Sequence, residues 1–124
     1  MRNIRLFSVP VLTICTALFP VVGGNAVAQT FPAKPITMVI PFAVGSGNDI
    51  VGRVFARKMA QNIGHPVLAD NREGASGNIA AMATKNAAPD GYTMFIASNS
   101  FSLNLHAMKV SFKLEDFAAV SLVG

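Results

Sequence analysis

The feature that most constrains the fold is a regular alternation of short apolar runs with longer helix-forming stretches. The runs at 36–40, 66–69 and 92–97 have the length and composition of strands, and the first, ITMVI, is apolar nearly throughout. Helices are predicted between them, over 49–63 and 78–86. Strands that alternate with helices imply βαβ units with right-handed crossovers. The sequence therefore predicts an α/β domain built on a parallel sheet.

Each predicted helix has an expected start and packing face. Asp49 is expected to cap the first helix, because a carboxylate can accept hydrogen bonds from the free N–H groups of the first turn. The apolar residues expected to face the sheet from this helix are Ile50, Val51, Val54, Phe55 and Met59. The second helix is alanine-rich and is expected to pack through Ile79, Met82 and Ala83.

The N-terminal segment has the organisation of a secretory signal peptide. Arg2 and Arg5 precede an apolar run over 6–22, and the A-x-A sequence at 26–28 supplies a cleavage site. The run is shorter than the ~20 residues that span a bilayer, which disfavours a membrane anchor. We therefore expect residues 1–28 to be a cleaved leader that directs the chain out of the cytoplasm, and residues 29–124 to form one α/β lobe.

Cleavage at this site would leave a cysteine-free chain, because Cys15 lies inside the leader. A lipid anchor on Cys15 would need a small residue before it, where Ile14 stands. The mature chain would have no disulfide framework. Its eight basic and six acidic residues give a net charge of +2, with no basic run, so nucleic-acid binding is not indicated.

Catalytic and cofactor motifs do not fit these residues. Asn48 and Asp49 stand where a P-loop needs Lys and Ser or Thr, and Ile50 stands at the third glycine of a dinucleotide fingerprint. No serine lies in a G-x-S-x-G elbow. Neither His65 nor His106 has a second ligand at metal spacing. We expect a monomer that binds without turnover and needs neither metal nor cofactor; an envelope enzyme is the disfavoured reading.

Three loops follow the expected strands, at 43–48, 70–77 and 98–100, and they consist largely of Gly, Ser, Asn and Ala. Ligands of open parallel sheets bind at the carboxyl ends of the strands. The first two loops lead into helix N-termini, which attract anions, so we expect these two ends to converge on a crevice for a carboxylate or phosphate. The alternatives are tight turns for the glycines and a solvated strand end for Ser98.

Four segments resemble the Bug receptors, the TctC-like substrate-binding proteins of tripartite tricarboxylate transporters. Residues 41–49 (PFAVGSGND) with Arg53 are similar to the opening P-F-x-x-G-G-x-x-D-x-x-x-R of that family. Residues 70–78 (DNREGASGN) resemble its E-N-R-x-G-A-G-G-N segment, and 88–93 reproduce its A-P-D-G-Y-T turn. Residues 115–123 (EDFAAVSLV) resemble its K-D-F-x-P-V-S-L-V strand, and the apolar run 117–124 is predicted as a strand.

The resemblance implies a periplasmic-binding-protein-like fold and a two-lobed receptor that takes a small carboxylate to integral-membrane transporter subunits. Family members are longer, so we expect this chain to be the first lobe, cut at its C-terminal end; a remnant that neither folds nor functions is the alternative. The candidate ligand-binding residues, taken from the loops and the resemblance together, are Gly45, Ser46, Gly47, Asn48, Asp49, Gly74, Ala75, Ser76, Gly77, Asn78 and Ser98.

Two departures from the family pattern lie among the candidate ligand-binding residues, where Ser46 and Ser76 replace glycines. A serine at a position that needs a positive φ would strain its loop. Otherwise each hydroxyl adds a hydrogen-bonding group to the expected site.

Overall fold

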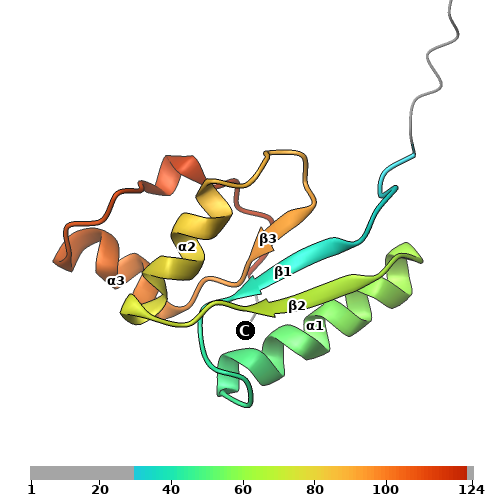
Figure 1. Cartoon of the computed structure of the whole chain (residues 1–124), viewed down its shortest axis with the longest axis horizontal. Helices are drawn as coiled ribbons and strands as arrows, with labels where there is room; N and C mark the ends of the chain where they lie inside the picture. The colour runs from blue at the N-terminus through green and yellow to red at the C-terminus, as the bar shows by residue number, and fades with distance from the viewer. Residues whose placement is uncertain (1–29, 123–124) are drawn as a thin grey trace, which may run out of the picture.

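A three-stranded parallel sheet of order β2-β1-β3 forms the centre of the fold (Figure 1). The computed structural model describes residues 30–122, so the predicted leader lies outside the described residues. The strands are β1 (Ile36–Ile40), β2 (Val67–Asn71) and β3 (Thr93–Phe95). The predicted α/β fold with a parallel sheet is confirmed, and β1 has the predicted bounds.

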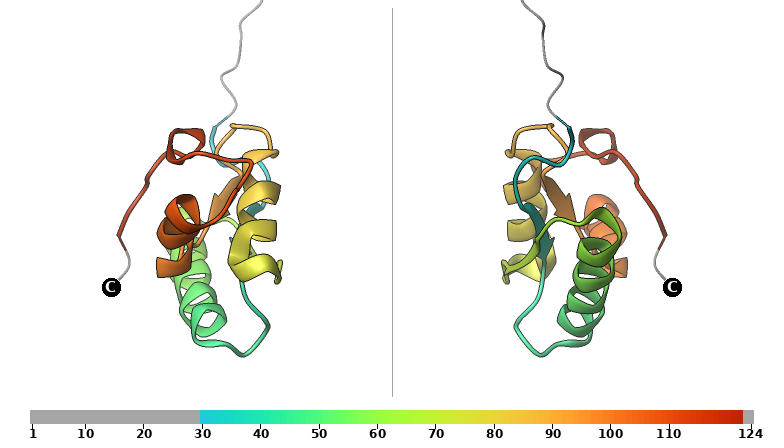
Figure 2. Two further views of the ribbon diagram at one scale, coloured as in Figure 1. Left: turned by 90° about the vertical axis from the view of Figure 1, so that its left-hand side faces the viewer. Right: turned by 90° about the vertical axis from the view of Figure 1, so that its right-hand side faces the viewer.

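Helices connect the strands across both faces of the sheet. Helix α1 (Gly47–Ile63) joins β1 to β2, and α2 (Asn78–Lys85) joins β2 to β3. Because β2 and β3 lie on opposite sides of β1, right-handed crossovers place α1 and α2 on opposite faces (Figure 2). A short turn of helix, η1 (Ala75–Gly77), precedes α2.

A third helix, α3 (Asn99–Ala107), starts where the sequence predicts only a polar loop. It lies beyond the carboxyl ends of β1 and β2 and packs against η1 and α2 (Figure 1). A last helical turn, η2 (Leu114–Asp116), follows. The strand predicted over 117–124 is wrong in its described part, since 117–122 are not in a strand and Leu122 is 96% exposed. Within the described residues no strand pairs with the outer edge of β3, and a strand needs such a partner.

The predicted packing face of α1 is also wrong. The residues that α1 buries are Asp49, Gly52 and Ala56. Of the apolar residues expected there, Met59 is half-buried. The other four are 37% to 58% exposed: Ile50, Val51, Val54 and Phe55. The small residues on the buried side let α1 lie close to the sheet. On α2, Ala80 and Ala81 are buried and the predicted Met82 packs against the core, whereas the predicted Ile79 is exposed.

The core has a part on each face of the sheet. Met38, Val39 and Ile40 of the central strand are buried, as expected for a strand that is covered on both faces. Beyond β3, the core continues as a cluster of side chains from α2, α3 and the C-terminal segment, whose buried members are Ala81, Phe101 and Phe112. Among residues 30–122, no helix combines the length and the apolarity that a membrane crossing requires.

Candidate functional site

An open groove lies at the carboxyl end of the sheet, where the loops after β1 and β3 meet the starts of α1 and α3. Its volume is about 430 Å³, and its lining is uncharged: Phe42, Asn48, Ala97, Ser98, Asn99 and Ser100. The structure thus brings together the predicted residues Asn48 and Ser98. The other four lining residues are additions, and the polar Ser-Asn-Ser run at 98–100 is the sequence signal that points to two of them.

Two helix N-termini border this groove. The cap of α1 is Ser46, whose Oγ accepts a hydrogen bond of 3.3 Å from the N–H of Asp49. The N–H groups of Gly47 and Asn48 have no acceptor among residues 30–122. Ser98 has the same position at α3, where the N–H of Phe101 donates to its carbonyl. Unpaired N–H groups at helix starts bind anions.

The second loop lies against α3 and does not line the groove. The Ser76 carbonyl accepts hydrogen bonds from Ser100 Oγ (3.2 Å) and Asn104 Nδ2 (3.0 Å). Asn104 Nδ2 also donates to Asn78 Oδ1 over 2.8 Å. The helix N-terminus that shares the groove with α1 is therefore that of α3, and the loop before α2 holds α3 in place. Gly74, Ala75 and Gly77 belong to the same loop and likewise do not line the groove.

The two serines that replace family glycines differ in backbone conformation. Ser46 has a φ of −69°, which any residue adopts, and it supplies the cap of α1. Ser76 has a φ of 55° and follows Ala75, which has a φ of 48°. These values lie in the left-handed region, where a side chain clashes with the backbone. Of the two serines, only Ser76 is therefore strained.

We expect Ser76→Gly to raise the free energy of unfolding by about 1 kcal/mol, because glycine removes the left-handed penalty and the backbone carbonyl keeps its partners. Ser46→Gly should lower it by roughly a few tenths of a kcal/mol, because it removes a cap hydroxyl where φ is already favourable. Urea unfolding of both variants measures the contrast. Loss of stability in Ser76→Gly would contradict the strain assigned to it.

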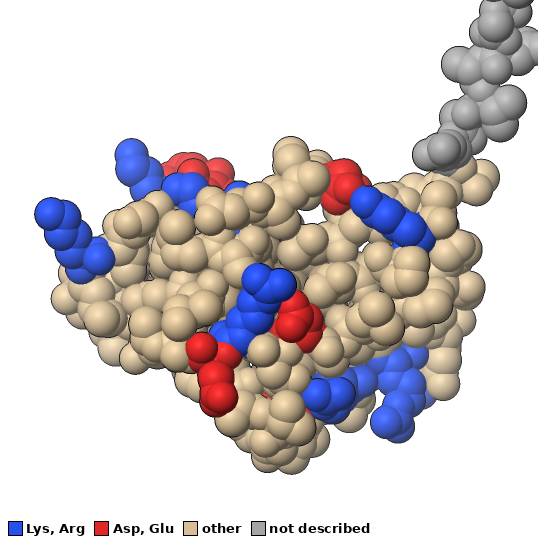
Figure 3. Space-filling model, in the orientation of Figure 1, with Lys and Arg blue, Asp and Glu red and all other residues tan. Residues whose placement is uncertain are grey.

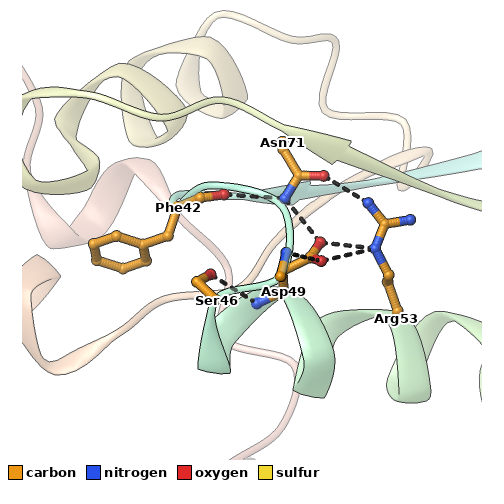
Figure 4. Close-up of polar contacts among 6 residues, drawn as sticks. Phe42, Ser46, Asp49, Arg53 and Asn71 are labelled. Carbon is orange, nitrogen blue, oxygen red and sulfur yellow. Dashed lines mark hydrogen bonds and ion pairs between the residues drawn. The ribbon is translucent and has the colours of Figure 1, made fainter.

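Asp49 is not the cap of α1, contrary to the sequence prediction. It is the third residue of the helix and is only 2% exposed. Its carboxylate accepts hydrogen bonds from the Gly45 N–H (2.8 Å), from Arg53 Nε (2.8 and 2.9 Å) and from Asn71 Nδ2 (2.8 Å) (Figure 4). Asn71 Nδ2 also donates to the Phe42 carbonyl over 3.0 Å. Protein groups on three segments therefore satisfy this carboxylate.

These contacts shift the acidity of Asp49. The Arg53 guanidinium, then the Gly45 N–H and the Asn71 amide, lower the pKa of its carboxyl group from 3.8 to about 2. A carboxyl group with a depressed pKa in the folded state stabilises the fold fully above its unfolded pKa, and this contribution is lost as the pH falls through the folded value. Hydrogen bonds from Lys34 and from the Lys113 backbone lower the pKa of Asp90 and Asp116 in the same direction.

We therefore expect the stability of the protein to fall as the pH drops from about 4 to about 2. The Asp49→Asn variant, which has no group to titrate at this position, should show a shallower fall over the same range. Urea unfolding at a series of pH values measures both slopes. Parallel curves for the two proteins would show that Asp49 does not carry the acid sensitivity.

Charged side chains lie scattered over the face of the molecule shown in Figure 3, and some of those on the described surface form ion pairs. The ion pairs are Lys34–Asp90 (3.0 Å), Arg53–Asp49 (2.8 Å), Arg72–Asp70 (2.8 Å) and Lys85–Asp116 (2.9 Å). Within 30–122 no three His, Cys, Asp or Glu side chains gather as metal ligands would. A charged ligand in the groove would therefore meet neutral hydrogen-bonding groups.

Comparison with known proteins gives consistent matches. A family described as "Tripartite tricarboxylate transporter family receptor" (TctC) matches residues 51–124, more than half of the chain. Protein BugT of Bordetella pertussis is 39% identical over 128 residues, which cover 100% of this chain and 38% of BugT. A UPF0065 protein of Bordetella bronchiseptica is 44% identical over 75 residues, covering 60% of this chain and 22% of that protein.

Solved structures agree with these matches. R. palustris Rpa4515 with adipate is 37% identical with a TM-score of 0.53, over 54% of this chain and 22% of that one. MatC of Rhodopseudomonas palustris with bound malate is 42% identical with a TM-score of 0.51, over 52% and 22%. The chain thus spans between about a fifth and two fifths of the length of these relatives. With four sequence segments, the fold and a family match in agreement, the chain belongs to the TctC family of tripartite tricarboxylate transporter receptors.

Proposed function

We propose that this chain is the first lobe of an extracytoplasmic receptor, which captures a small carboxylate in the periplasm and delivers it to a tripartite tricarboxylate-type transporter without catalysing a reaction. Residues 1–28 would serve as the export leader and 29–124 as the lobe. Family membership supports the receptor role. The adipate and malate bound to two structural relatives support the ligand class.

The groove between α1 and α3 is the observation that carries this proposal. It offers the amides of Asn48 and Asn99 and the N–H groups of two helix starts, beside the Ser98 and Ser100 hydroxyls, which bond to each other over 2.6 Å. No acidic side chain is among its lining residues to repel a carboxylate. Hydrogen bonds to an ionised acceptor are about twice as strong as neutral ones, so neutral donors suffice to hold it.

The second loop supports the proposed site without lining the groove. Ser100 and Asn104 tie α3 to the Ser76 carbonyl, so the position of the α3 start depends on this loop. The predicted residues Gly74, Ala75, Ser76, Gly77 and Asn78 remain part of the proposed site in this supporting sense. In the first loop, Gly45, Ser46 and Gly47 shape the start of α1 beside Asn48.

Isothermal titration of the chain with malate and adipate tests the proposal. We expect saturable binding by at least one acid, weakened roughly tenfold in Asn48→Ala, which loses a hydrogen bond to a charged group, and weakened also in Ser98→Ala, which loses the contact with Ser100 at the start of α3. Asn62→Ala and Ser102→Ala are matched controls, because both residues are exposed and lie on α1 and α3 outside the groove lining. Absence of binding, or equal losses in the controls, would contradict the proposed site.

A remnant that neither folds stably nor binds is the second candidate. The exposed apolar side chains of α1, together with exposed Val120 and Leu122, favour it because such side chains are usually covered in a stable protein. Thermal unfolding followed by circular dichroism separates the two readings. A cooperative transition that shifts upward with malate or adipate would exclude the remnant.

A further inference from the structure

The loop between β1 and α1 places two lining residues of the groove, Phe42 and Asn48, at its two ends. Little packing holds this loop in shape. Ala43, Val44 and Gly45 are exposed, and Val44 is an apolar residue without a covering neighbour. Its backbone closes one turn, in which the Ser46 N–H donates to the Ala43 carbonyl over 3.1 Å. Polar contacts from outside the loop must therefore supply the rest of its order.

Asp49, Arg53 and Asn71 supply those contacts, and we call them the clamp. At one end of the loop, Asn71 Nδ2 holds the Phe42 carbonyl over 3.0 Å. At the other end, Asp49 holds the Gly45 N–H over 2.8 Å and immediately follows Asn48 in the chain. Arg53 Nη2 donates to Asn71 Oδ1 over 2.9 Å, which closes the ring of contacts (Figure 4).

The clamp does not line the groove, and only its carboxylate is buried, since Arg53 is exposed and Asn71 is partly buried. Asp49 is 2% exposed, and none of the clamp residues is among those that line the groove. Arg53 lies against both carboxylate oxygens, so it compensates a negative charge that would otherwise oppose an anionic ligand nearby. The clamp can therefore act on a ligand through the loop and through charge compensation, although it makes no contact in the groove.

From this geometry we infer that Asp49, Arg53 and Asn71 are positioning residues for ligand binding: they fix the loop so that Phe42 and Asn48 face the groove. This inference rests on the proposed function. It changes the role of Asp49 from a ligand contact to a support. A purely structural role, such as stabilising the start of α1 through the helix dipole, would affect stability and leave affinity unchanged.

Asp49→Asn tests the inference, with Asp90→Asn as its matched control. Asp90 also accepts hydrogen bonds from one cationic side chain and one backbone N–H, those of Lys34 and Tyr92, at the opposite end of the strands. In isothermal titration with malate and adipate, Asp49→Asn should bind at least roughly tenfold more weakly. Asp90→Asn should stay within about twofold of the unchanged protein. Asn71→Ala, which releases the Phe42 carbonyl, should also weaken binding and serves if Asp49→Asn does not fold.

NMR of the backbone amides gives a second readout that needs no ligand. The Gly45 amide proton should move upfield in Asp49→Asn, because a hydrogen bond to a carboxylate is lost, and the Gly47 and Asn48 signals should change with it. Unchanged loop signals, or equal loss of affinity in Asp90→Asn, would overturn the inference. If the unchanged protein binds neither acid, the proposed function fails, and the loop signals alone still decide whether the clamp sets the loop.

Discussion

Replacing Phe101 by alanine is expected to lower the free energy of unfolding by about 3 to 5 kcal/mol, a large part of the stability of a domain of this size. Phe101 is 8% exposed and lies at the centre of an aromatic cluster. Its ring centroid lies 5.5 Å from that of Phe95, 5.6 Å from that of Phe112 and 5.3 Å from that of Phe117. Alanine would remove all three contacts and leave a cavity that the surrounding rings fill only in part.

Thermal and urea unfolding measure this effect, with Leu103→Ala as the control. Leu103 is an apolar residue of the same helix whose side chain is exposed, so its loss should change stability by less than about 0.5 kcal/mol. Because α3 forms one wall of the groove, Phe101→Ala should also weaken ligand binding at temperatures where the variant is still folded. Equal losses in the two variants would show that the cluster does not anchor α3.

The sequence is sufficient to predict the sheet because its central strand obeys simple rules. ITMVI is a short apolar run bounded by Pro35 and Pro41. A strand that is covered on both faces needs such a run, because its side chains are buried on both sides. Alternation with helix-forming stretches then leads to parallel pairing. The groove lies at the carboxyl end of this sheet, as expected for an open α/β fold, and it contains Asn48 and Ser98.

The start of α1 is harder to predict, because two residues of capping type lie three positions apart. Ser46 and Asp49 can each accept hydrogen bonds from a first turn. Their Ser-x-x-Asp spacing is itself a signature of a helix start at the serine. The buried position of Asp49 depends on Arg53 and on Asn71, and the latter is 22 residues away in the chain. No local sequence pattern predicts such a contact.

Tertiary contacts also decide the position of α3. Its residues show no clear apolar stripe, and short helices are marginal on their own. The helix is held by Phe101 in the aromatic cluster and by Asn104, which is buried and bonded to the second loop. Sequence reasoning predicts a loop there because these partners lie in separate segments. For the same reason, the sequence does not predict that the N-terminus of α3, rather than that of α2, borders the groove with the N-terminus of α1.

The predicted packing face of α1 is wrong for a specific physical reason, and the same reason predicts a large loss of stability when Gly52 is enlarged. Apolar periodicity assumes that large side chains face the core. In α1 the contact is made at Gly52, where an added Cβ would lie 2.8 Å from Ile40 Cδ1 and 2.9 Å from Ile96 Cδ1. The helix crosses the sheet so closely because this residue has no side chain.

Gly52→Leu should therefore lower the free energy of unfolding by about 3 kcal/mol or more, since overfilling a packed interior forces the helix or the strand to move. Ile40 is fully buried, so its side chain can yield only by displacing its neighbours in the core. Val51→Leu enlarges the exposed neighbouring side chain and should change stability by less than about 0.5 kcal/mol. Urea unfolding compares the two variants. Equal stability would mean that α1 does not need glycine at its crossing point. A larger loss in Gly52→Leu, accompanied by weaker malate or adipate binding, would show that this close approach also sets the start of α1 beside the groove.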